Sequence, residues 1–442
     1  MNFRRILFWL HLLAGVSAGA VIGVMCLTGG ALAFEKEIMA WSERDLRRIQ
    51  VPADGAHPLA LDELLAKARA DSPNLRPSMV TIYADPRCAV LLSAGRTNAV
   101  YVDPYHGKVK RSARSPWRSF MQTMVNWHRW LGQDGDRRAV TKAITGACNA
   151  AFLFLALTGL YLWWPRHWSG PLLRAIALFD LRLRGKARDW NWHNVIGLWS
   201  APVLIVLTAT AMPISYRWAG DLIYTLTGTA APPPSAAPPG SAADVAVPSP
   251  PPGVPRISPG KALAAAQQAV PSWQEITLRL GVDRAQGSGR ALRPGPGDDS
   301  SGRPRPLMVT VKPRAAWPKF ASVQLAVDPF TGAVLRREEY AGYNRGRKVR
   351  SWTRFLHTGE ALGVAGQALA GFASLGGAML VYTGCALAWR RFFSKRQEVS
   401  PSPALADSLS RRMGEDRARV LGTTCGRAFR WITGRQAGPS GP

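Results

Sequence analysis

The sequence has few cysteines, and none of them is spaced to bind a metal through paired thiolates. The five cysteines are Cys26, Cys88, Cys148, Cys385 and Cys425, and no two of them form a C-x-x-C pair. Three of them lie within apolar runs. This spacing supports neither a disulfide framework nor a zinc or iron–sulfur site. We interpret the cysteines as separate, buried or lone thiols.

Acidic residues are also scarce, because 28 Asp and Glu stand against 56 Lys and Arg, which gives a formal net charge of +28. The sequence has no helix-turn-helix, zinc-finger or single-strand-binding pattern, so we expect no nucleic-acid partner. It also lacks a nucleophile–histidine–acid grouping and an HExxH motif, which disfavours a hydrolase. No G-x-G-x-x-G fingerprint is present in the tail, and we expect no flavin or nicotinamide domain there.

The hydrophobic residues are concentrated in four long runs, at about Ile6–Phe34, Thr145–Trp164, Trp192–Tyr216 and Leu362–Trp389. The first run is longer than a signal-peptide core of roughly 7–15 residues. At about 1.5 Å per residue, helices of these lengths cross a hydrocarbon core of about 30 Å. We therefore predict an α-helical integral membrane protein with four transmembrane helices in contact with lipid.

Lys and Arg in the short segments predict the orientation of the spans. Arg4 and Arg5 precede the first span, and the loop at 167–191 and the tail at 392–442 are rich in arginine. Such charges mark the cytoplasmic side. We predict that both termini and this loop are cytoplasmic, that the two long segments are periplasmic, and that the protein lies in the bacterial inner membrane.

The chain contains two copies of a helix–domain–helix unit. The stretch at 102–109, VDPYHGKV, matches VDPFTGAV at 327–334, and Thr158-Gly159 in the second span matches Thr383-Gly384 in the fourth. An Asp-Pro-aromatic-x-Gly stretch between β-rich runs predicts a hairpin turn. Helical patterns at 61–70 and 260–270 precede strand-like runs. Each long segment is thus predicted to be a small α+β module, one helix packed on a small antiparallel sheet.

These assignments predict the domain order. It comprises transmembrane helix 1 (1–34), module 1 (35–120), a histidine segment with transmembrane helix 2 (121–166), a basic loop (167–191), transmembrane helix 3 (192–218), a Pro-rich linker (219–259), module 2 (260–350), a second histidine segment with transmembrane helix 4 (351–391) and a basic tail (392–442). Within it, 230–259 is predicted to be a disordered linker and 285–306 a polar loop.

The Asp-Pro-x-x-Gly-x-Val turns are similar to those of PepSY domains. The spans, with histidine near one end and Thr-Gly near the other, resemble PepSY-associated transmembrane proteins, and the third span differs in having Thr208-Ala209. The resemblance implies two PepSY-like modules and an iron-regulated membrane protein of the ferric-siderophore reductase type. It also implies that electrons are delivered to periplasmic ferric chelates, which releases the iron.

Four of the seven histidines belong to the spans or to their approaches. His11 and His193 lie six residues after Arg5 and five after Arg188, and so at nearly equal depth, about 8–9 Å along a helix. His128 and His357 precede the second and fourth spans on the opposite side, at or above the outer interface. Two layers with two histidines each are what two bis-imidazole b-type haems require. We therefore predict that His11 pairs with His193, and His128 with His357, as axial ligands of two haem irons.

Several neighbours fit this prediction. Gly15 and Gly197, one turn after their histidines, would leave room for a flat macrocycle. Arginines would face the haem propionates, with Arg4, Arg5 and Arg188 at one layer and Arg118, Arg129, Arg350 and Arg354 at the other. His57, His106 and His167 are predicted to have no role in the site.

Two functions remain open. The first is a di-haem b transmembrane oxidoreductase that reduces a ferric siderophore or ferric chelate, with electrons from a cytoplasmic reductase or from quinol. The second is a non-enzymatic, membrane-tethered PepSY binding or regulatory module with structural histidines. A secondary transporter is disfavoured because the spans carry no acidic residue at the midplane.

Overall fold

The computed structural model describes residues 2–53, 56–72, 75–111, 115–233, 245–248, 253–280 and 304–393. Residues 234–244 and 249–252 of the predicted Pro-rich linker, residues 285–303 of the predicted polar loop and the basic tail after 393 lie outside these ranges. The chain divides into the units Met1–Ala388 and Trp389–Pro442. The arrangement below concerns the first unit.

In the described part of the chain, four helices are long and apolar enough to cross a membrane, as the sequence predicted. They are α1 (Phe3–Leu32), α6 (Arg137–Trp163), α8 (Gly185–Ser215) and α12 (Gly363–Phe392). Both α6 and α8 begin before the predicted spans, because polar residues continue each helix beyond its apolar run. Side chains such as Leu13 and Val16 of α1 are more than half exposed and so face lipid. The protein is therefore an integral membrane protein in contact with lipid.

Small residues bring the spans together. Ala18, Ile22 and Cys26 of α1 pack with Phe152 of α6, and Phe152 also contacts a second cluster around Leu204. A Cβ atom built on Gly377 of α12 would lie only 2.7 Å from Cys26 Sγ. Such close approach is typical of helices that associate in a membrane, where van der Waals packing replaces the hydrophobic effect.

The two modules share a single antiparallel sheet. The first contributes β1 (Met79–Tyr83), β2 (Val90–Ala94), β3 (Asn98–Val102) and β4 (Val109–Arg111). The second contributes β5 (Trp273–Arg279), β6 (Leu307–Pro313), β7 (Val323–Val327) and β8 (Val334–Glu338). The strand order is β4-β3-β2-β1-β5-β6-β7-β8.

The prediction of two separate sheets was therefore wrong. β1 pairs with β5, and Thr81 lies opposite Thr277 at the junction, where their hydroxyls are 3.0 Å apart. Each module alone would leave its first strand as an edge with unpaired backbone groups. Pairing the two edges satisfies both, which explains why the duplicated modules join at these strands.

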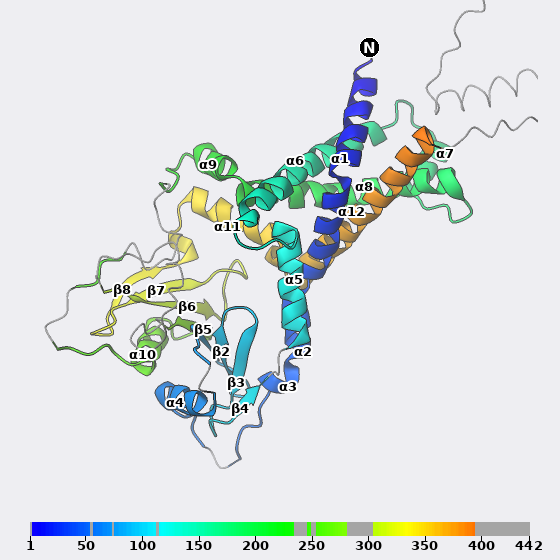
Figure 1. Ribbon diagram of the computed structural model, residues 1–442. Helices are drawn as coiled ribbons and strands as arrows, with labels where there is room; N and C mark the ends of the chain where they lie inside the picture. The colour runs from blue at the N-terminus through cyan, green and yellow to red at the C-terminus, as the bar shows by residue number, and fades with distance from the viewer. Residues whose placement is uncertain are drawn as a thin grey trace, which may run out of the picture. The chain divides into compact units, whose positions relative to one another are not determined.

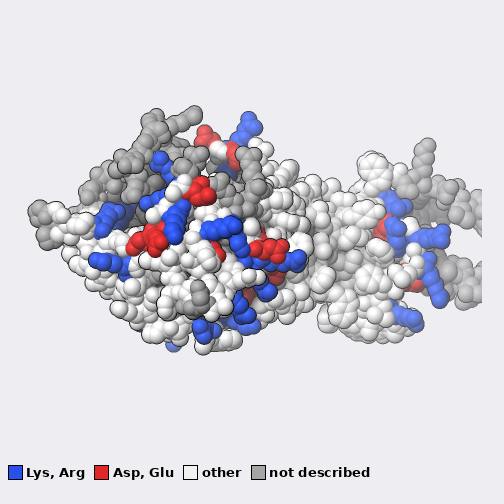
Figure 2. Space-filling view, turned by 90° about the horizontal axis from the view of Figure 1, so that it is seen from below, with Lys and Arg blue, Asp and Glu red and all other residues white. Residues whose placement is uncertain are grey.

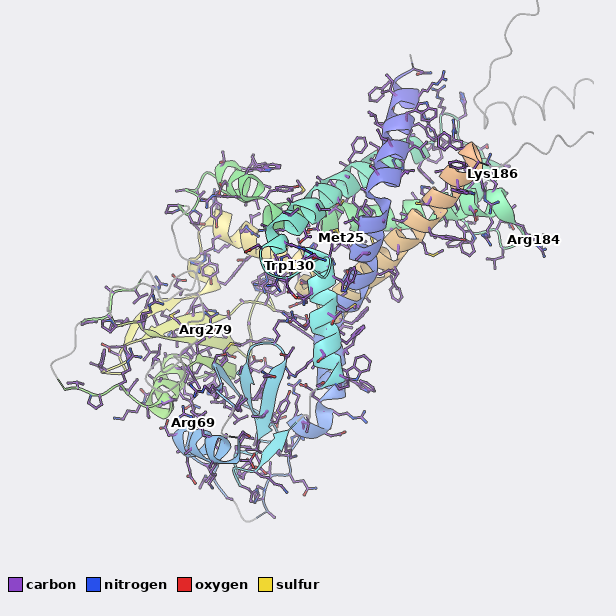
Figure 3. The ribbon with its side chains drawn as sticks, in the orientation of Figure 1. Met25, Arg69, Trp130, Arg184, Lys186 and Arg279 are labelled. Atoms are coloured by element: carbon purple, nitrogen blue, oxygen red, sulfur yellow. The ribbon has the colours of Figure 1, made fainter. Side chains whose placement is uncertain are left out.

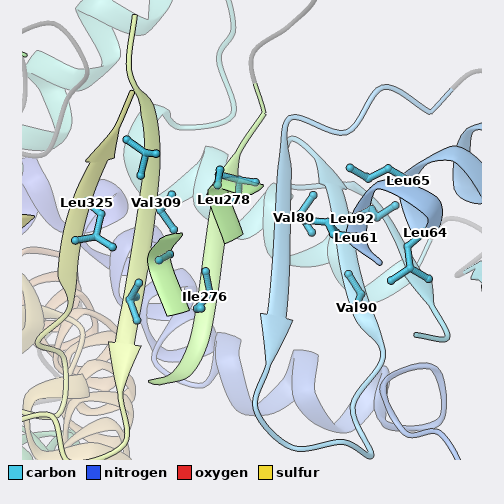
Figure 4. Close-up of a cluster of buried hydrophobic side chains, with 14 of the residues drawn as sticks. Leu61, Leu64, Leu65, Val80, Val90, Leu92, Ile276, Leu278, Val309 and Leu325 are labelled. Carbon is cyan, nitrogen blue, oxygen red and sulfur yellow. The ribbon is translucent and has the colours of Figure 1, made fainter. Parts of the chain in front are cut away.

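Helices α4 (Leu61–Asp71) and α10 (Pro259–Ala269) pack on one face of the sheet. Figure 4 shows the buried cluster that they form, in which Leu61 and Leu64 meet Val80 and Leu92 of the first module, and Ile276 and Leu278 continue it into the second. The predicted hairpin turns are confirmed, because Asp103 and Asp328 each accept a hydrogen bond from the backbone two residues later.

Shorter helices connect the sheet to the spans (Figure 1). They include α2 (Glu35–Ser42), α3 (Arg44–Arg47), α5 (Pro116–Trp130), α9 (Arg217–Leu226), α11 (Arg345–His357) and the 3-10 turns η2 (Tyr340–Gly342) and η3 (Glu360–Leu362). A further short helix, α7 (Gly170–Ala177), lies in the loop between α6 and α8. The predicted linker thus begins with a helix, since α9 covers 219–226. On the face in Figure 2, charged side chains gather in two zones with an uncharged zone between them, as a membrane-spanning region requires.

Candidate functional site

The first pair of histidines lies far from the sheet, within the spans, and is called here the far pair. His11 of α1 places its Nδ1 2.8 Å from Thr158 Oγ1 of α6, and His193 of α8 places its Nδ1 2.9 Å from Thr383 Oγ1 of α12. Each contact therefore joins the two spans of one repeat. The two rings are close enough to interact electrostatically. The structure thus brings together the two histidines that depth along the helices had paired.

The second pair lies at the end of the spans nearer the sheet and is called here the sheet-side pair. His128 of α5 places its Nδ1 3.0 Å from Met25 O and 3.1 Å from Thr28 Oγ1, both in α1. His357, the last residue of α11, places its Nδ1 2.9 Å from Leu207 O of α8. The ring centres of His128 and His357 are 6.4 Å apart, and the ring planes are inclined by 49°. Met25 and Trp130 mark this region in Figure 3.

The sheet-side pair does not lie above the spans, as the sequence had suggested. Its contacts are with Met25 and Leu207, several residues before α1 and α8 end. Leu131 and Gly132, with φ of 49° and 74°, turn the chain after α5. Helix α5 is therefore not an extension of α6. In the second repeat, Gly359 and Gly363, with φ of 76° and 65°, separate α11 from α12 in the same way, so a residue count along one helix from His357 to Trp389 placed His357 too far out.

At each Thr-Gly motif of the repeat, an imidazole ring packs closely against the glycine. A Cβ atom built on Gly159 would lie 3.3 Å from Cε1 of His11, and one on Gly384 would lie 3.4 Å from Cε1 of His193. A Cβ on Gly29, next to Thr28, would lie 3.2 Å from Cε1 of His128. A larger residue would push the ring away. The third span has alanine at this place, and there the ring of His357 bonds a backbone carbonyl instead.

The hydrogen bonds assign the tautomer of all four rings. The hydroxyl proton of Thr158 is donated to Phe154 O at 2.7 Å, and that of Thr383 to Met379 O at 2.8 Å. Since a hydroxyl has one proton, each oxygen must accept from the histidine, so Nδ1 carries the hydrogen. His128 and His357 face carbonyl oxygens, which can only accept. In every ring Nε2 is therefore the nitrogen with the free lone pair, which is the atom that binds a metal.

Most of the arginines that the sequence assigned to propionates have other partners. Arg4 donates to Leu162 O at 2.6 Å, Arg188 to Asp189 Oδ1 at 2.9 Å, and Arg350 to Pro213 O at 2.9 Å. Arg118 binds both carboxylate oxygens of Glu43, at 2.5 and 2.6 Å. By contrast, Arg129 and Arg354 lie over the rings of Trp130 and Phe355.

The helices that carry the sheet-side pair are anchored to the sheet by groups that sequence analysis missed. The carboxylate of Glu43, which is 2% exposed, accepts hydrogen bonds from Arg118 of α5 and from the hydroxyl of Tyr101 of β3, the latter at 2.7 Å. Burial and then the neighbouring Glu43 raise the pKa of Tyr101. In the second repeat, Arg347 of α11 binds Glu338 of β8 at 2.7 Å. Nothing in the sequence marked Glu43, because its partners Tyr101 and Arg118 lie 58 and 75 residues away in the chain.

The remaining candidates lie apart from the two pairs. His57 and His167 are exposed, and His106 bonds Asp103 within its turn at 3.1 Å. Cβ atoms on Gly15 and Gly197 would make only ordinary contacts, at 3.8 and 3.7 Å from leucines of the neighbouring spans. Within the described ranges, no three or more His, Cys, Asp or Glu side chains are grouped to hold a bare metal ion.

Comparison with the curated proteins found no match. The PepSY-associated TM region, as a family profile, matches residues 8–391. This match covers all four spans, both histidine pairs and the three Thr-Gly motifs. The chain therefore belongs to the PepSY-associated TM region family.

Proposed function

We propose that this protein carries electrons across the membrane through two b-type haems and reduces a ferric siderophore or another ferric chelate on the periplasmic side. One observation carries the proposal. Four imidazoles, held as the Nδ1–H tautomer, form two pairs at two depths, and each pair takes one ring from each repeat. A single structural histidine needs no such arrangement, whereas two axial-ligand pairs do.

The sheet-side pair fits an iron porphyrin in its spacing. Two imidazoles that bind one metal ion from opposite sides, at about 2 Å per bond, place their ring centres roughly 6 Å apart. The ring centres of His128 and His357 are 6.4 Å apart. His128 and His357 would hold the iron of such a group, and the porphyrin would supply the remaining ligands. This accounts for pairs of histidines without a third ligand beside them.

The far pair offers a further donor for a haem. Trp192, next to His193, has a buried indole Nε1–H without an acceptor among the described residues. A buried donor without a partner costs about 1–3 kcal/mol, so an acceptor is favoured there. A propionate carboxylate is such an acceptor.

The chain's own residues would position the ligands and exclude water. Thr158, Thr383 and Thr28 hold the rings so that Nε2 points away from the bonded Nδ1. The cluster around Phe152 and Leu204 fills the space among the spans with apolar atoms. When bound, haem would supply the one-electron redox chemistry, at potentials set by the ligand residues, their burial and the hydrogen bonds to the ligand histidines.

The proposed orientation rests on positive charge. The basic loop at 167–191 and the N-terminal arginines support a far pair on the cytoplasmic side of the bacterial inner membrane and a sheet in the periplasm. A cytoplasmic reductase or quinol would then supply electrons. One electron passed to Fe(III) gives Fe(II), whose weaker hold on hard oxygen ligands releases it from the chelate.

The test is a reduced-minus-oxidised absorption spectrum of the detergent-purified protein, with pyridine haemochrome quantification. We expect about two b-type haems per chain, since each haem takes two axial histidines. Replacing either member of one pair with alanine should leave about one, and His57→Ala and His167→Ala should leave both. A colourless protein, expressed with adequate haem, would contradict the proposal. It would favour a non-enzymatic module in which the eight-stranded sheet binds or regulates a partner.

A further inference from the structure

Two arginines beside the sheet-side pair have no carboxylate partner within the described ranges. Arg129 follows His128 on α5, and Arg354 lies one turn before His357 on α11. Both are exposed. Arg129 lies 4.6 Å from the ring centre of Trp130, and Arg354 lies 5.7 Å from that of Phe355. The two repeats thus contribute the same feature, an arginine that lies over an aromatic ring next to the histidine.

The two guanidinium groups belong to one cluster of positive charge. Arg129 is close enough to Arg354, Arg96 and Arg138 to be repelled by all three. Two of these neighbours are already neutralised, since Arg96 pairs with Glu35 and Arg138 pairs with Asp134 at 2.6 Å.

Arg350, which Arg354 repels as well, donates to Pro213 O and not to a carboxylate. The cluster therefore keeps excess positive charge at Arg129 and Arg354. Within the described residues, neither Arg129 nor Arg354 pairs with a carboxylate, although the two lie close enough to repel each other, which favours an external anion.

We propose that Arg129 and Arg354 form an anion-binding site that brings negatively charged, carboxylate-bearing ferric chelates to the sheet-side pair. The role of the chelate as an electron acceptor rests on the proposed function, but the binding of an anion does not. A guanidinium group matches a carboxylate with two parallel hydrogen bonds. The contact of each guanidinium with an aromatic ring, at 4.6 and 5.7 Å from the ring centre, limits its movement. Anionic chelates should therefore bind here more tightly than neutral ones of similar size.

The test uses gallium(III) citrate, a redox-inert anionic analogue of the ferric complex, and the uncharged gallium(III) maltolate. Binding to the purified full-length protein is measured by isothermal titration calorimetry for the wild type, R129Q, R354Q and the double variant. Matched controls are R137Q and R345Q, because Arg137 and Arg345 are exposed arginines at the starts of α6 and α11. Haem content and the absorption spectrum are recorded for every sample.

Each single variant should bind gallium citrate about ten-fold more weakly, as expected for the loss of a charge-assisted contact. Binding of the maltolate and the behaviour of both controls should not change. Raising the salt concentration should weaken citrate binding in the wild type more than in the double variant.

The other outcomes are distinct. If haem content or the spectrum changes in R129Q and R354Q while citrate binding stays constant, the arginines serve the haem propionates and the proposal is wrong. Equal citrate binding in all variants overturns it as well. If the wild type contains no haem but the variants still lose citrate binding, the anion site stands and only the proposed electron transfer fails.

Discussion

The most direct test of the histidine geometry is the substitution Thr158→Val. Valine keeps the shape of threonine but removes Oγ1, which accepts the hydrogen of His11 Nδ1 at 2.8 Å. Thr158 is 6% exposed, so water cannot readily replace the lost acceptor. His11 Nδ1–H would then be left without a partner, or the ring would rotate or change its tautomer. In each case Nε2 is no longer fixed as the free nitrogen.

The expected loss follows from the role of Thr158 as the hydrogen-bond partner that orients a metal-binding histidine. Removing such a partner typically lowers metal affinity about 10–100-fold. One hydrogen bond that contributes about 1.4 kcal/mol corresponds to a ten-fold change. We therefore expect the far haem of Thr158→Val to dissociate about ten-fold more readily, and the haem of the sheet-side pair to be unchanged. The assay is haem transfer to excess apomyoglobin, followed by absorbance.

Thr210→Val is the matched control. Thr210 is 9% exposed and lies in α8, where its hydroxyl donates to Val206 O at 2.6 Å, in the same way as Thr158 donates to Phe154 O. No histidine bonds it in the described residues. If Thr158→Val and Thr210→Val retain both haems equally, the threonine does not orient the ring, and the reasoning about the tautomer is refuted.

Two further predictions concern stability. Arg118→Gln should destabilise the protein by about 3–5 kcal/mol, because it leaves the carboxylate of Glu43 buried without its cation. Urea unfolding followed by tryptophan fluorescence measures the loss, with Arg87→Gln, at an exposed ion pair, as the control. Equal stability of the two variants would contradict the prediction. Gly377→Ala should destabilise the protein by about 1–3 kcal/mol, because the added Cβ overpacks against Cys26. Gly15→Ala is the control and should be nearly neutral, because its Cβ would contact only Leu155, at 3.8 Å. Thermal unfolding in detergent compares the two variants, and a neutral Gly377→Ala would show that the helices can move apart at no cost.

Local patterns in the sequence were sufficient for a large part of the fold. The four spans follow from apolar length, and the hairpin turns follow from Asp-Pro-aromatic-x-Gly, in which Gly107 and Gly332 take φ of 68° and 81°. The helices before the strands were also predicted within one or two residues. These features depend on neighbours along the chain, so the sequence alone was enough to predict them.

The pairing of the histidines was only partly within reach of the sequence. Depth along the helices paired His11 with His193, because rise per residue is constant in a straight helix. His128 and His357 were predicted to lie at or above the outer interface, because the sequence could not show that the turns at Leu131 and Gly359 set α5 beside α1 and α11 beside α8. The atoms that hold the rings were not predicted either, although the Thr-Gly repeat was visible.

Tertiary structure decided the rest, because it depends on contacts between residues far apart in the chain. The pairing of β1 with β5 joins the two modules across nearly two hundred residues. The partners of Arg118 and Arg350 were likewise settled by which carboxylate or carbonyl the fold brought near, and not by charge alone. The sequence determined which segments form helices, turns and a repeat. The tertiary structure determined which nitrogen of each histidine is free, since that depends on an acceptor from another helix.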